Sequence, residues 1–251
     1  MIELKNVSKS FGPKVVLDRL NLRVEKGESF VIVGGSGTGK SVTLKHMIGI
    51  LRPDEGRVFI EGADVTDFTR QEWFRIRRRF GMSFQEAALF DFMTVFENVA
   101  FPIRRHTDLD EKAIRKRVAE CLEMVGLSGN EHLFPAELSG GMRRRAGFAR
   151  SIALNPEVLL FDEPTTGLDP VMTDQIDAVI NTLRRGLDVT CVTITHDMIS
   201  AFDIADRIGM LDEGRIVFVG TPDEFLASDL PIIRAFLKGR ISQENTSRGE
   251  I

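Results

Sequence analysis

The first third of the chain contains short stretches of alternating hydrophobic and polar residues. Ile2 to Val7, Leu20 to Val24 and Val58 to Ile60 are separated by glycine-containing turn signals, and this pattern predicts an antiparallel β-sheet. Phe30 to Val33 differs because all four residues are apolar. A continuous apolar run of this kind is typical of a strand buried on both faces of a parallel sheet. Two later runs have the same character: Val158 to Phe161 and Val189 to Ile194.

Apolar residues recur with helical spacing in the second half. Ile114, Val118 and Leu122 share one face of a helix, with Asp110 ahead as a start signal and Gly126 behind as a stop signal. A similar pattern covers residues 176–183. Alternating strands and helices predict an α/β fold with a parallel core, in one domain of residues 1–240. The mostly helical residues 83–155 predict an inserted helical subdomain, and the polar residues 241–251 predict a frayed tail.

The composition is that of a folded protein without a strongly charged surface. Its 251 residues are 43% hydrophobic and carry 33 basic against 37 acidic side chains, a formal net charge of -4. This balance provides no general attraction to nucleic acid or anionic lipid, so any such contact has to be local. Cys121 and Cys191 lie inside apolar stretches, which predicts buried thiols in a reducing, cytosolic compartment. We expect neither a secretory signal nor a membrane-spanning segment.

A glycine-rich segment follows the Phe30 to Val33 strand and leads into residues 42–50, which have helical character. Strand, glycine-rich loop and helix in this order are typical of a phosphate-binding loop. Its glycines let backbone N–H groups turn toward phosphate oxygens, and the helix adds the positive end of its dipole. A glycine-rich turn with a chance lysine is the alternative. The loop residues are Gly34, Gly35, Ser36, Gly37, Thr38, Gly39, Lys40 and Ser41, of which Lys40 would reach the β- and γ-phosphates and Ser41 would bind Mg²⁺.

Two carboxylates follow the apolar run Val158 to Phe161. Burying acidic groups at a strand end is costly unless a cation is near, so Asp162 suits a metal contact. Glu163 suits a general base that accepts a proton from water. An ordinary acidic cap on the strand is the alternative.

A serine and two glycines precede another expected helix, Met142 to Leu154. Ser139, Gly140 and Gly141 are typical of a second anion-binding helix N-terminus, although a plain helix cap has the same sequence. Two anion sites in one chain suggest a nucleotide held between two copies of the protein.

These segments occur in the order found in ATP-binding-cassette ATPases, and the similarity covers nearly the whole chain. The resemblance implies a RecA-like parallel sheet with an antiparallel β subdomain and an inserted helical subdomain, ATP and Mg²⁺ as ligands, and ATP hydrolysis by a dimer. By this resemblance Phe11 stacks on adenine, Gln85 binds Mg²⁺ and senses the partner subunit, and His196 holds the γ-phosphate. Asp169 links the two sites of the dimer. The γ-phosphate of the ATP held by the partner is contacted by Ser139, Gly140 and Gly141. Considered singly, Phe11 also fits a core residue, Gln85 a surface amide and Asp169 a turn.

The chain departs from the family pattern at two positions. Met142 stands where glutamine is common, and Val42 stands where a hydroxyl residue is common. Val42 therefore lacks a side-chain contact to the α-phosphate. Neither change removes a metal ligand or the base, so the resemblance still implies an active ATPase.

Within the family, the chain resembles the ATPase subunits of Mla- or Mce-type lipid transporters at three places: Phe84 to Phe90, Met93 to Thr107 and Met142. The resemblance implies a homodimer, membrane permease subunits, a periplasmic MCE-domain lipid-binding protein, a small STAS-domain regulator, and a place on the cytoplasmic face of the inner membrane. An apolar cluster is expected either to receive a permease helix or to form core: Leu89, Phe90, Phe92, Met93 and Phe96. Near the end, a second apolar group is expected to pack on a neighbouring subunit or to complete the fold: Pro231, Ile232, Ile233, Phe236 and Leu237.

Other protein classes share part of this pattern. Another importer or exporter of the family has the same motifs. A soluble cassette ATPase that acts on nucleic acid or ribosomes would use the arginines at 77–79 and 143–145. The negative net charge and the single cassette instead favour solvated helix faces at these arginines and no nucleic-acid partner. A phosphate-loop kinase would phosphorylate an acceptor instead of releasing phosphate.

Overall fold

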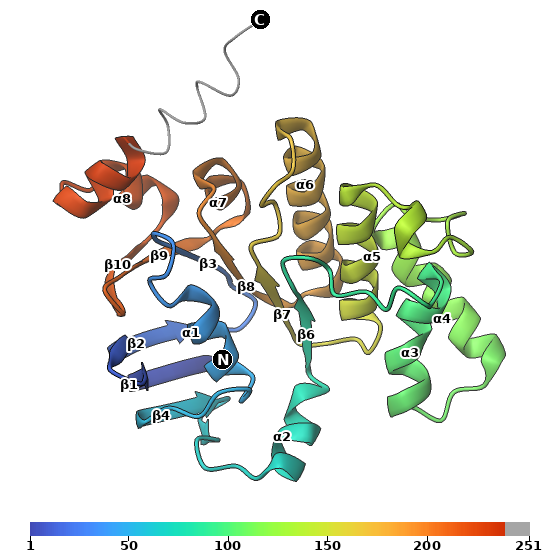
Figure 1. Ribbon diagram of the computed structural model, residues 1–251, viewed down its shortest axis with the longest axis horizontal. Coiled ribbons are helices and arrows are strands. Elements are labelled where there is room, and N and C mark those ends of the chain that lie inside the picture. Colours follow the sequence, from blue (N-terminus) through green and yellow to red (C-terminus); the bar gives the residue numbers. More distant parts are fainter. Residues whose placement is uncertain (239–251) are drawn as a thin grey trace, which may run out of the picture. The chain divides into compact units, whose positions relative to one another are not determined.

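The computed structural model of the protein describes residues 1–238 (Figure 1). The tail expected at 241–251 lies outside the described residues. The chain forms two compact units, the first from residues 1–67 and from residue 194 onward, the second from residues 68–193. The second unit includes the segment 83–155 but also strands and two helices outside it, so the expected limits of a helical subdomain stay a prediction.

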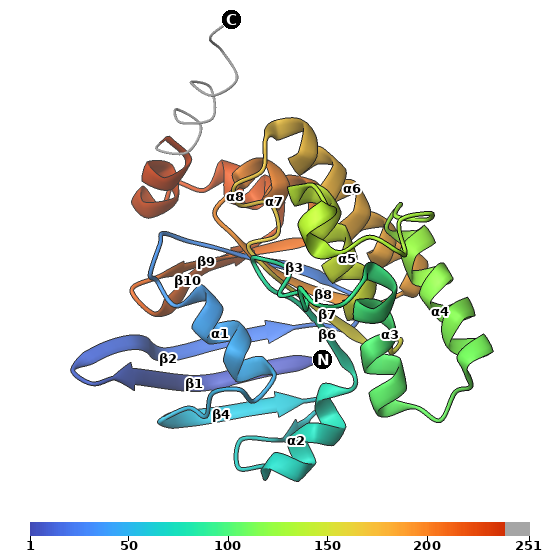
Figure 2. The ribbon, with the colours of Figure 1, turned by 45° about the vertical axis from the view of Figure 1, so that its right-hand side comes forward.

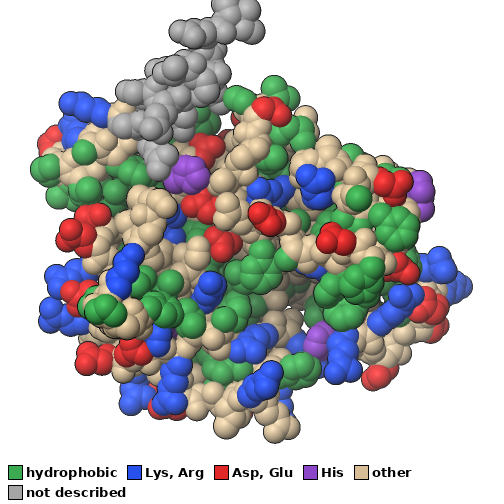
Figure 3. Space-filling view, in the orientation of Figure 1, with side chains coloured by type: hydrophobic (Ala, Val, Ile, Leu, Met, Phe, Trp, Pro, Cys, Tyr) green, Lys and Arg blue, Asp and Glu red, His purple; other side chains and the backbone are tan. Residues whose placement is uncertain are grey.

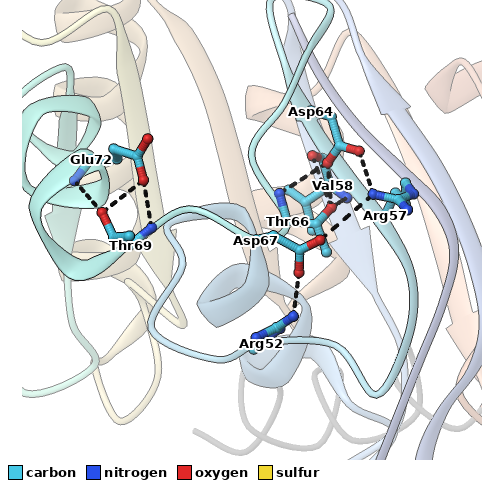
Figure 4. Close-up of polar contacts among 8 residues, drawn as sticks. All are labelled: Arg52, Arg57, Val58, Asp64, Thr66, Asp67, Thr69 and Glu72. Atoms are coloured by element: carbon cyan, nitrogen blue, oxygen red, sulfur yellow. Dashed lines mark hydrogen bonds and ion pairs between the residues drawn. The ribbon is translucent and has the colours of Figure 1, made fainter.

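The first unit contains the expected antiparallel sheet. Strands β1 (Ile2–Phe11), β2 (Lys14–Val24), β4 (Glu55–Ile60) and β5 (Ala63–Asp64) pair antiparallel in the order β2-β1-β4-β5. The three longer strands lie side by side at the blue end of the ribbon (Figure 1). The turn after β5 is fixed by polar contacts, since Thr66 Oγ1 donates to Asp64 Oδ1 at 2.6 Å and Arg57 Nη1 donates to Asp64 Oδ2 at 2.7 Å (Figure 4).

A second group of strands in this unit carries the phosphate loop. All five residues of β3 (Ser29–Val33) are buried, and β3 pairs in parallel with β9 (Arg207–Asp212), as its apolar sequence predicts. Strand β10 (Arg215–Gly220) pairs antiparallel with β9. The helices of this unit include α1 (Lys40–Met47), α7 (Met198–Ile204) and α8 (Pro222–Ala227). Helix α1 begins and ends earlier than the expected 42–50, because the chain leaves the helix before Gly49, which has a φ of +63°.

The last described residues, 231–238, are helical and complete the fold locally. Ile233 and Leu237 are buried within the chain itself, while Pro231 and Ile232 are exposed. This arrangement agrees with the second of the two expectations for this segment. Among residues 1–238, no helix is both long and apolar enough to cross a membrane.

The second unit combines strands with helices. Strand β6 (Phe80–Ser83) pairs in parallel with β7 (Val158–Asp162), which neighbours β8 (Thr190–Thr195), and β8 leads the chain back to the first unit. Its helices are α2 (Arg70–Arg77), α3 (Val95–His106), α4 (Glu111–Met124), α5 (Gly140–Ile152) and α6 (Pro170–Leu187), with a short 3-10 helix at Pro135–Glu137. Figure 2 shows α3, α4 and α5 as neighbours. The two units together have the expected α/β composition, with antiparallel and parallel strands.

Side chains at the helix starts decide where these helices begin. Thr69 and Glu72 form a capping box at α2 (Figure 4), and Asp110 caps α4 as expected by accepting from the Ala113 N–H at 2.7 Å. Ser139 caps α5 by accepting from the Met142 N–H at 3.2 Å. The helix therefore includes both glycines and starts two residues before the expected Met142, a correction that follows from the cap.

Helix α5 packs closely against β6 and β7. The rings of Phe148 and Phe161 meet edge to face with their centroids 5.0 Å apart. A Cβ atom on Gly81 of β6 would lie 2.3 Å from the carbonyl oxygen of Ser151, so glycine is required for this approach. The core of the unit also encloses Cys121 and Cys191, which are buried as predicted.

Candidate functional site

Glycines shape the loop after β3 where a side chain does not fit. A Cβ atom on Gly34 would lie 2.3 Å from the backbone oxygen of Leu211, and one on Gly39 would lie 2.8 Å from Leu17 Cδ2. Gly39 also has a φ of +107° directly before α1, a conformation that favours glycine. Among the described residues no side chain caps the N-terminus of α1. The positive end of this helix therefore faces the loop, as an anion-binding site requires.

Lys40 directs its ammonium group into this loop. The side chain is only 7% exposed, and Nζ donates to the backbone oxygens of Gly34 at 2.9 Å and Gly35 at 3.0 Å. Thr38 Oγ1 donates to the same Gly35 oxygen at 2.9 Å, which holds the loop closed on itself. Ser41 and Val42 follow on the first turn of α1 and are half-buried. The lysine thus lies where phosphate oxygens can replace the backbone carbonyls as its acceptors.

Phe11 and His196 are the other predicted ATP residues in the first unit. Phe11 is 47% exposed, so the alternative of a core residue is wrong, and its ring is accessible for stacking. Lys9 Nζ lies 5.8 Å from the ring centroid. His196 follows β8 directly at its carboxyl end and is half-buried. Sites on open α/β sheets lie at such strand ends.

In the second unit, Asp162 ends β7 and Glu163 begins the turn that follows. Both carboxylates are half-buried. Glu163 has a φ of +50°, the left-handed region that non-glycine residues seldom adopt. Its Oε2 accepts a hydrogen bond from Thr166 Oγ1 at 3.0 Å. The backbone N–H of Thr166 also donates to the Glu163 carbonyl at 3.4 Å and closes the turn.

Arg144 on α5 holds the same turn from outside. Its Nη1 donates to the Glu163 carbonyl at 3.2 Å and its Nη2 to the Thr166 carbonyl at 2.7 Å. The side chain is 9% exposed, so the prediction that the arginines at 143–145 form a solvated helix face is wrong at this position. Arg143 and Arg145 also donate to backbone carbonyls, those of Leu138 and Gly126. Charge alone did not reveal Arg144, but its spacing of four from the buried Phe148 places it on the inner face of the helix.

The serine and glycines at the start of α5 lie beside the Asp169 segment. Ser139 and Asp169 are both exposed and both act as helix caps, Asp169 by accepting from the Met172 N–H at 3.0 Å. A Cβ atom on Gly141 would lie 1.8 Å from Met172 Cε, and one on Gly140 would lie 3.5 Å from a methyl group of Leu168. Ser139 therefore acts as a helix cap, which was the alternative to an anion-binding site. Its hydroxyl oxygen accepts the capping hydrogen bond, so the hydroxyl proton is not used in that bond.

Gln85 is exposed on a loop that α5 also holds. Ala87 and Ala88 have φ values of +60° and +47°, and Arg150 donates to both of their carbonyl oxygens at 2.8 Å. Burial lowers the pKa of the Arg150 guanidinium. Nothing in the sequence pattern distinguishes this arginine from a surface charge.

The predicted site residues therefore fall into two sets. The first unit holds Phe11, the phosphate loop from Gly34 to Val42, and His196. The second unit holds Gln85, Asp162, Glu163, Asp169 and the segment 139–141, which α5 and the turn after β7 organise together.

The donor atoms of the predicted metal ligands suit magnesium. Ser41, Gln85 and Asp162 offer a hydroxyl, an amide and a carboxylate oxygen, and Mg²⁺ prefers oxygen ligands. Among the described residues there is no group of three or more His, Cys, Asp or Glu side chains that could hold a metal alone. Mg²⁺ in nucleotide sites is usually held by one or two carboxylates together with substrate phosphates, so the residues present fit a nucleotide-bound ion.

Comparisons with known proteins place this arrangement in a family. Residues 17–166 match the family model described as ABC transporter. The chain is 44% identical over 239 residues to the probable ribonucleotide transport ATP-binding protein mkl of Mycobacterium leprae, covering 95% of this chain and 69% of the relative. It is 43% identical over 240 residues to the intermembrane phospholipid transport system ATP-binding protein MlaF of Haemophilus influenzae, covering 95% and 90%. The MlaF of Escherichia coli K12 is 38% identical over 239 residues, covering 95% and 89%.

Solved structures agree with these relatives. A dimeric ATP-binding cassette in a post-hydrolysis state with bound ADP and Pi superposes with a TM-score of 0.81 at 33% identity, covering 88% of this chain and 99% of that one. The cbiO1 protein of Clostridium perfringens, part of an ABC transporter complex, gives a TM-score of 0.83 at 27% identity, covering 99% and 98%. The chain therefore belongs to the ABC transporter family, as one of its ATP-hydrolysing cassettes.

Proposed function

We propose that this chain hydrolyses ATP to drive phospholipid transport between the inner and outer membrane, as the cassette subunit of a transporter with membrane permease subunits. The observation that carries the proposal is the similarity to two MlaF proteins at 43% and 38% identity over 95% of the chain. Ribonucleotide transport is the second candidate, because the mycobacterial relative named for it is 44% identical. The cassette motifs do not depend on cargo, so the two candidates share one mechanism of ATP hydrolysis.

In this mechanism the phosphate loop holds the triphosphate. Its N–H groups and the N-terminus of α1 bind phosphate oxygens, and Lys40 leaves the carbonyls of Gly34 and Gly35 to contact the β- and γ-phosphates. Phe11 stacks on adenine. Ser41, Gln85 and Asp162 would hold Mg²⁺, which would neutralise charge on the phosphates. Glu163 accepts the proton of the attacking water, and His196 holds the γ-phosphate.

The second anion site serves the partner copy. Ser139 and Asp169 are exposed, and Gly140 leaves the backbone at the start of α5 without a side chain. A homodimer in which each ATP lies between one phosphate loop and the partner's 139–141 segment uses this surface. The dimeric cassette with ADP and Pi supports this arrangement by similarity.

A groove along α3 supports docking of a permease segment. It has a volume of about 390 Å³ and is lined by Phe92, Met93, Glu97, Phe101, Arg104 and Arg105. Phe92 is 76% exposed, and Leu89, Phe90, Met93 and Phe96 are half-buried, so the cluster does not belong to a closed core. Figure 3 shows hydrophobic side chains at the surface over α3 and the segment before it. An apolar anchor with an acidic neighbour fits this groove, because its rim carries Arg105, while the neighbouring Arg104 is already paired with Glu111.

The remaining partners follow from the same proposal. Docking to a permease places the chain on the cytoplasmic face of the inner membrane, and a periplasmic MCE-domain protein binds the lipid. A small STAS-domain protein acts as regulator. No nucleic-acid partner is proposed, since several arginines that would form a basic patch donate to backbone carbonyls, among them Arg78 to the His106 oxygen at 2.8 Å.

The test is purification of the full-length chain from native membranes, with mass spectrometry of the associated proteins and lipids. We expect permease and MCE-domain subunits, and ATP-dependent movement of a labelled phospholipid by the reconstituted complex. Phe92→Asp should abolish recovery of the permease but leave ATP binding unchanged, because Phe92 lies in the groove and outside the phosphate loop. A complex that moves labelled ribonucleotides and no phospholipid would favour the second candidate.

A further inference from the structure

Arg144 occupies a junction between the segments that carry three predicted site residues. It lies on α5, which begins after Ser139, and its guanidinium donates to the carbonyls of Glu163 and Thr166. Glu86, the neighbour of Gln85, attracts the same guanidinium electrostatically, although burial is the larger effect and lowers the Arg144 pKa. A buried charge of this kind is retained only where its hydrogen bonds are satisfied. Arg144 therefore connects the 139–141 helix with the turn that carries Glu163.

The turn itself is strained and depends on this support. A non-glycine residue in the left-handed region costs roughly 1 to 3 kcal/mol, and it persists where neighbouring groups hold it. The two carbonyls held by Arg144 are those of Glu163 and Thr166, the first and last residues of the turn. Thr166, at the far end of that turn, donates to the carboxylate of Glu163 itself at 3.0 Å. The side chain of Arg144 thus holds the backbone of Glu163, and the side chain of Thr166 holds its carboxylate.

We propose that Arg144 and Thr166 are positioning residues for ATP hydrolysis, which orient the Glu163 carboxylate and tie its place to the helix that begins at Ser139. The inference rests on the proposed role of Glu163 as the base. Arg144 acts on the backbone of the turn, and Thr166 acts on the carboxylate. The planar guanidinium suits this task because two of its nitrogens reach separate carbonyls in a fixed fork, whereas a lysine offers one nitrogen on a flexible stem.

Helix α5 also lies close to the start of α6. The Gly141 position allows no Cβ without displacement of Met172, and the start of α6 is capped by Asp169 beside it.

The test compares substitutions that keep charge or hydroxyl with substitutions that do not, in the full-length chain with its co-purified membrane partners. Arg144→Lys should lower kcat about tenfold or more, because misplacement of a reacting group by about 1 Å costs up to about a hundredfold. The KM for ATP should change less than about twofold. Arg145→Lys is the matched control, since Arg145 is the next residue on α5 and donates to Gly126, and it should keep kcat.

Thr166 gives a second, independent comparison. Thr166→Val should lower kcat without changing KM, and Thr166→Ser should restore it, because only the serine retains the donor to the carboxylate. If Arg144→Lys does not fold, the pair of Thr166 variants decides alone. Equal kcat in the valine and serine variants, or an Arg144→Lys chain with unchanged kcat, would overturn the inference.

Glu163→Gln separates this inference from the proposed base. With Glu163 as the base, Glu163→Gln is inactive, and adding Arg144→Lys or Thr166→Val to it causes no further loss. A Glu163→Gln chain that turns over ATP at the normal rate contradicts the base itself. An inactive Glu163→Gln chain together with a fully active Arg144→Lys chain contradicts the positioning role only.

Discussion

Gly34 and Gly35 are neighbours in the phosphate loop, yet they meet different surroundings. The Cβ position of Gly34 is 2.3 Å from a backbone oxygen of Leu211, an atom that cannot rotate away. The Cβ position of Gly35 is 3.6 Å from Thr38 Cγ2, an ordinary van der Waals distance. A run of glycines in a sequence therefore contains positions of unequal importance, and only the structure separates them.

Gly34→Ala is expected to lower the free energy of unfolding by about 1 to 3 kcal/mol, the usual cost of overpacking. Gly35→Ala is its control and should stay within about 0.5 kcal/mol of the wild type. Urea unfolding at equilibrium measures both. Equal stability of the two variants would show that the β9 strand yields easily at Leu211.

The sequence predicts those site residues that belong to motifs, and it does not predict residues whose contacts form only on folding. Lys40, Glu163 and Ser139 were predicted because motifs with a known mechanism contain them. Arg144 and Thr166 act through backbone carbonyls and a carboxylate that are brought near by folding. Glu163 is 19 residues from Arg144 and 3 residues from Thr166 along the chain. The contact with Arg144 therefore leaves no signal in the local sequence.

At the scale of elements, hydrophobic periodicity predicted the existence and type of the strands and helices discussed above. Their limits depended on features that periodicity does not contain. Helix α5 starts at Gly140 because Ser139 caps it, and α1 stops at Met47 before the left-handed Gly49. The antiparallel sheet was predicted from three strands, whereas β5 is too short to give a pattern.

Helix α4 and strand β8 make a prediction about chemical reactivity. Cys121 and Cys191 are fully buried, and burial raises the pKa of the Cys121 thiol to about 11. Near pH 8 the reactive thiolate of Cys121 is therefore rare. An aromatic disulfide reagent should detect no thiol in the native chain and both after denaturation.

A Cys191→Ser variant is the control for this count, and it should release one thiol after denaturation and none before. Reaction of native Cys121 at the rate of a free cysteine would mean that α4 opens readily from its unit.

Several predicted site residues of the molecule share one property, which is that they are exposed. Phe11, Gln85, Ser139 and Asp169 all reach the surface of the units that carry them. Exposure is expected of these residues if each ATP site is formed jointly by two copies of the chain, because residues that contact the nucleotide or the partner then have to lie at the surface of one copy. The net charge of -4 agrees with association through specific contacts rather than through a general field.

In the proposed dimer, two copies enclose ATP between the phosphate loop of one and the 139–141 segment of the other. The most direct test is the molar mass of the Glu163→Gln chain by light scattering, with Mg²⁺ and saturating ATP. We predict twice the mass of the chain with two ATP molecules retained, and a single-chain mass when Lys40→Ala is added. A Glu163→Gln chain that binds ATP fully and keeps the mass of one copy would contradict the account.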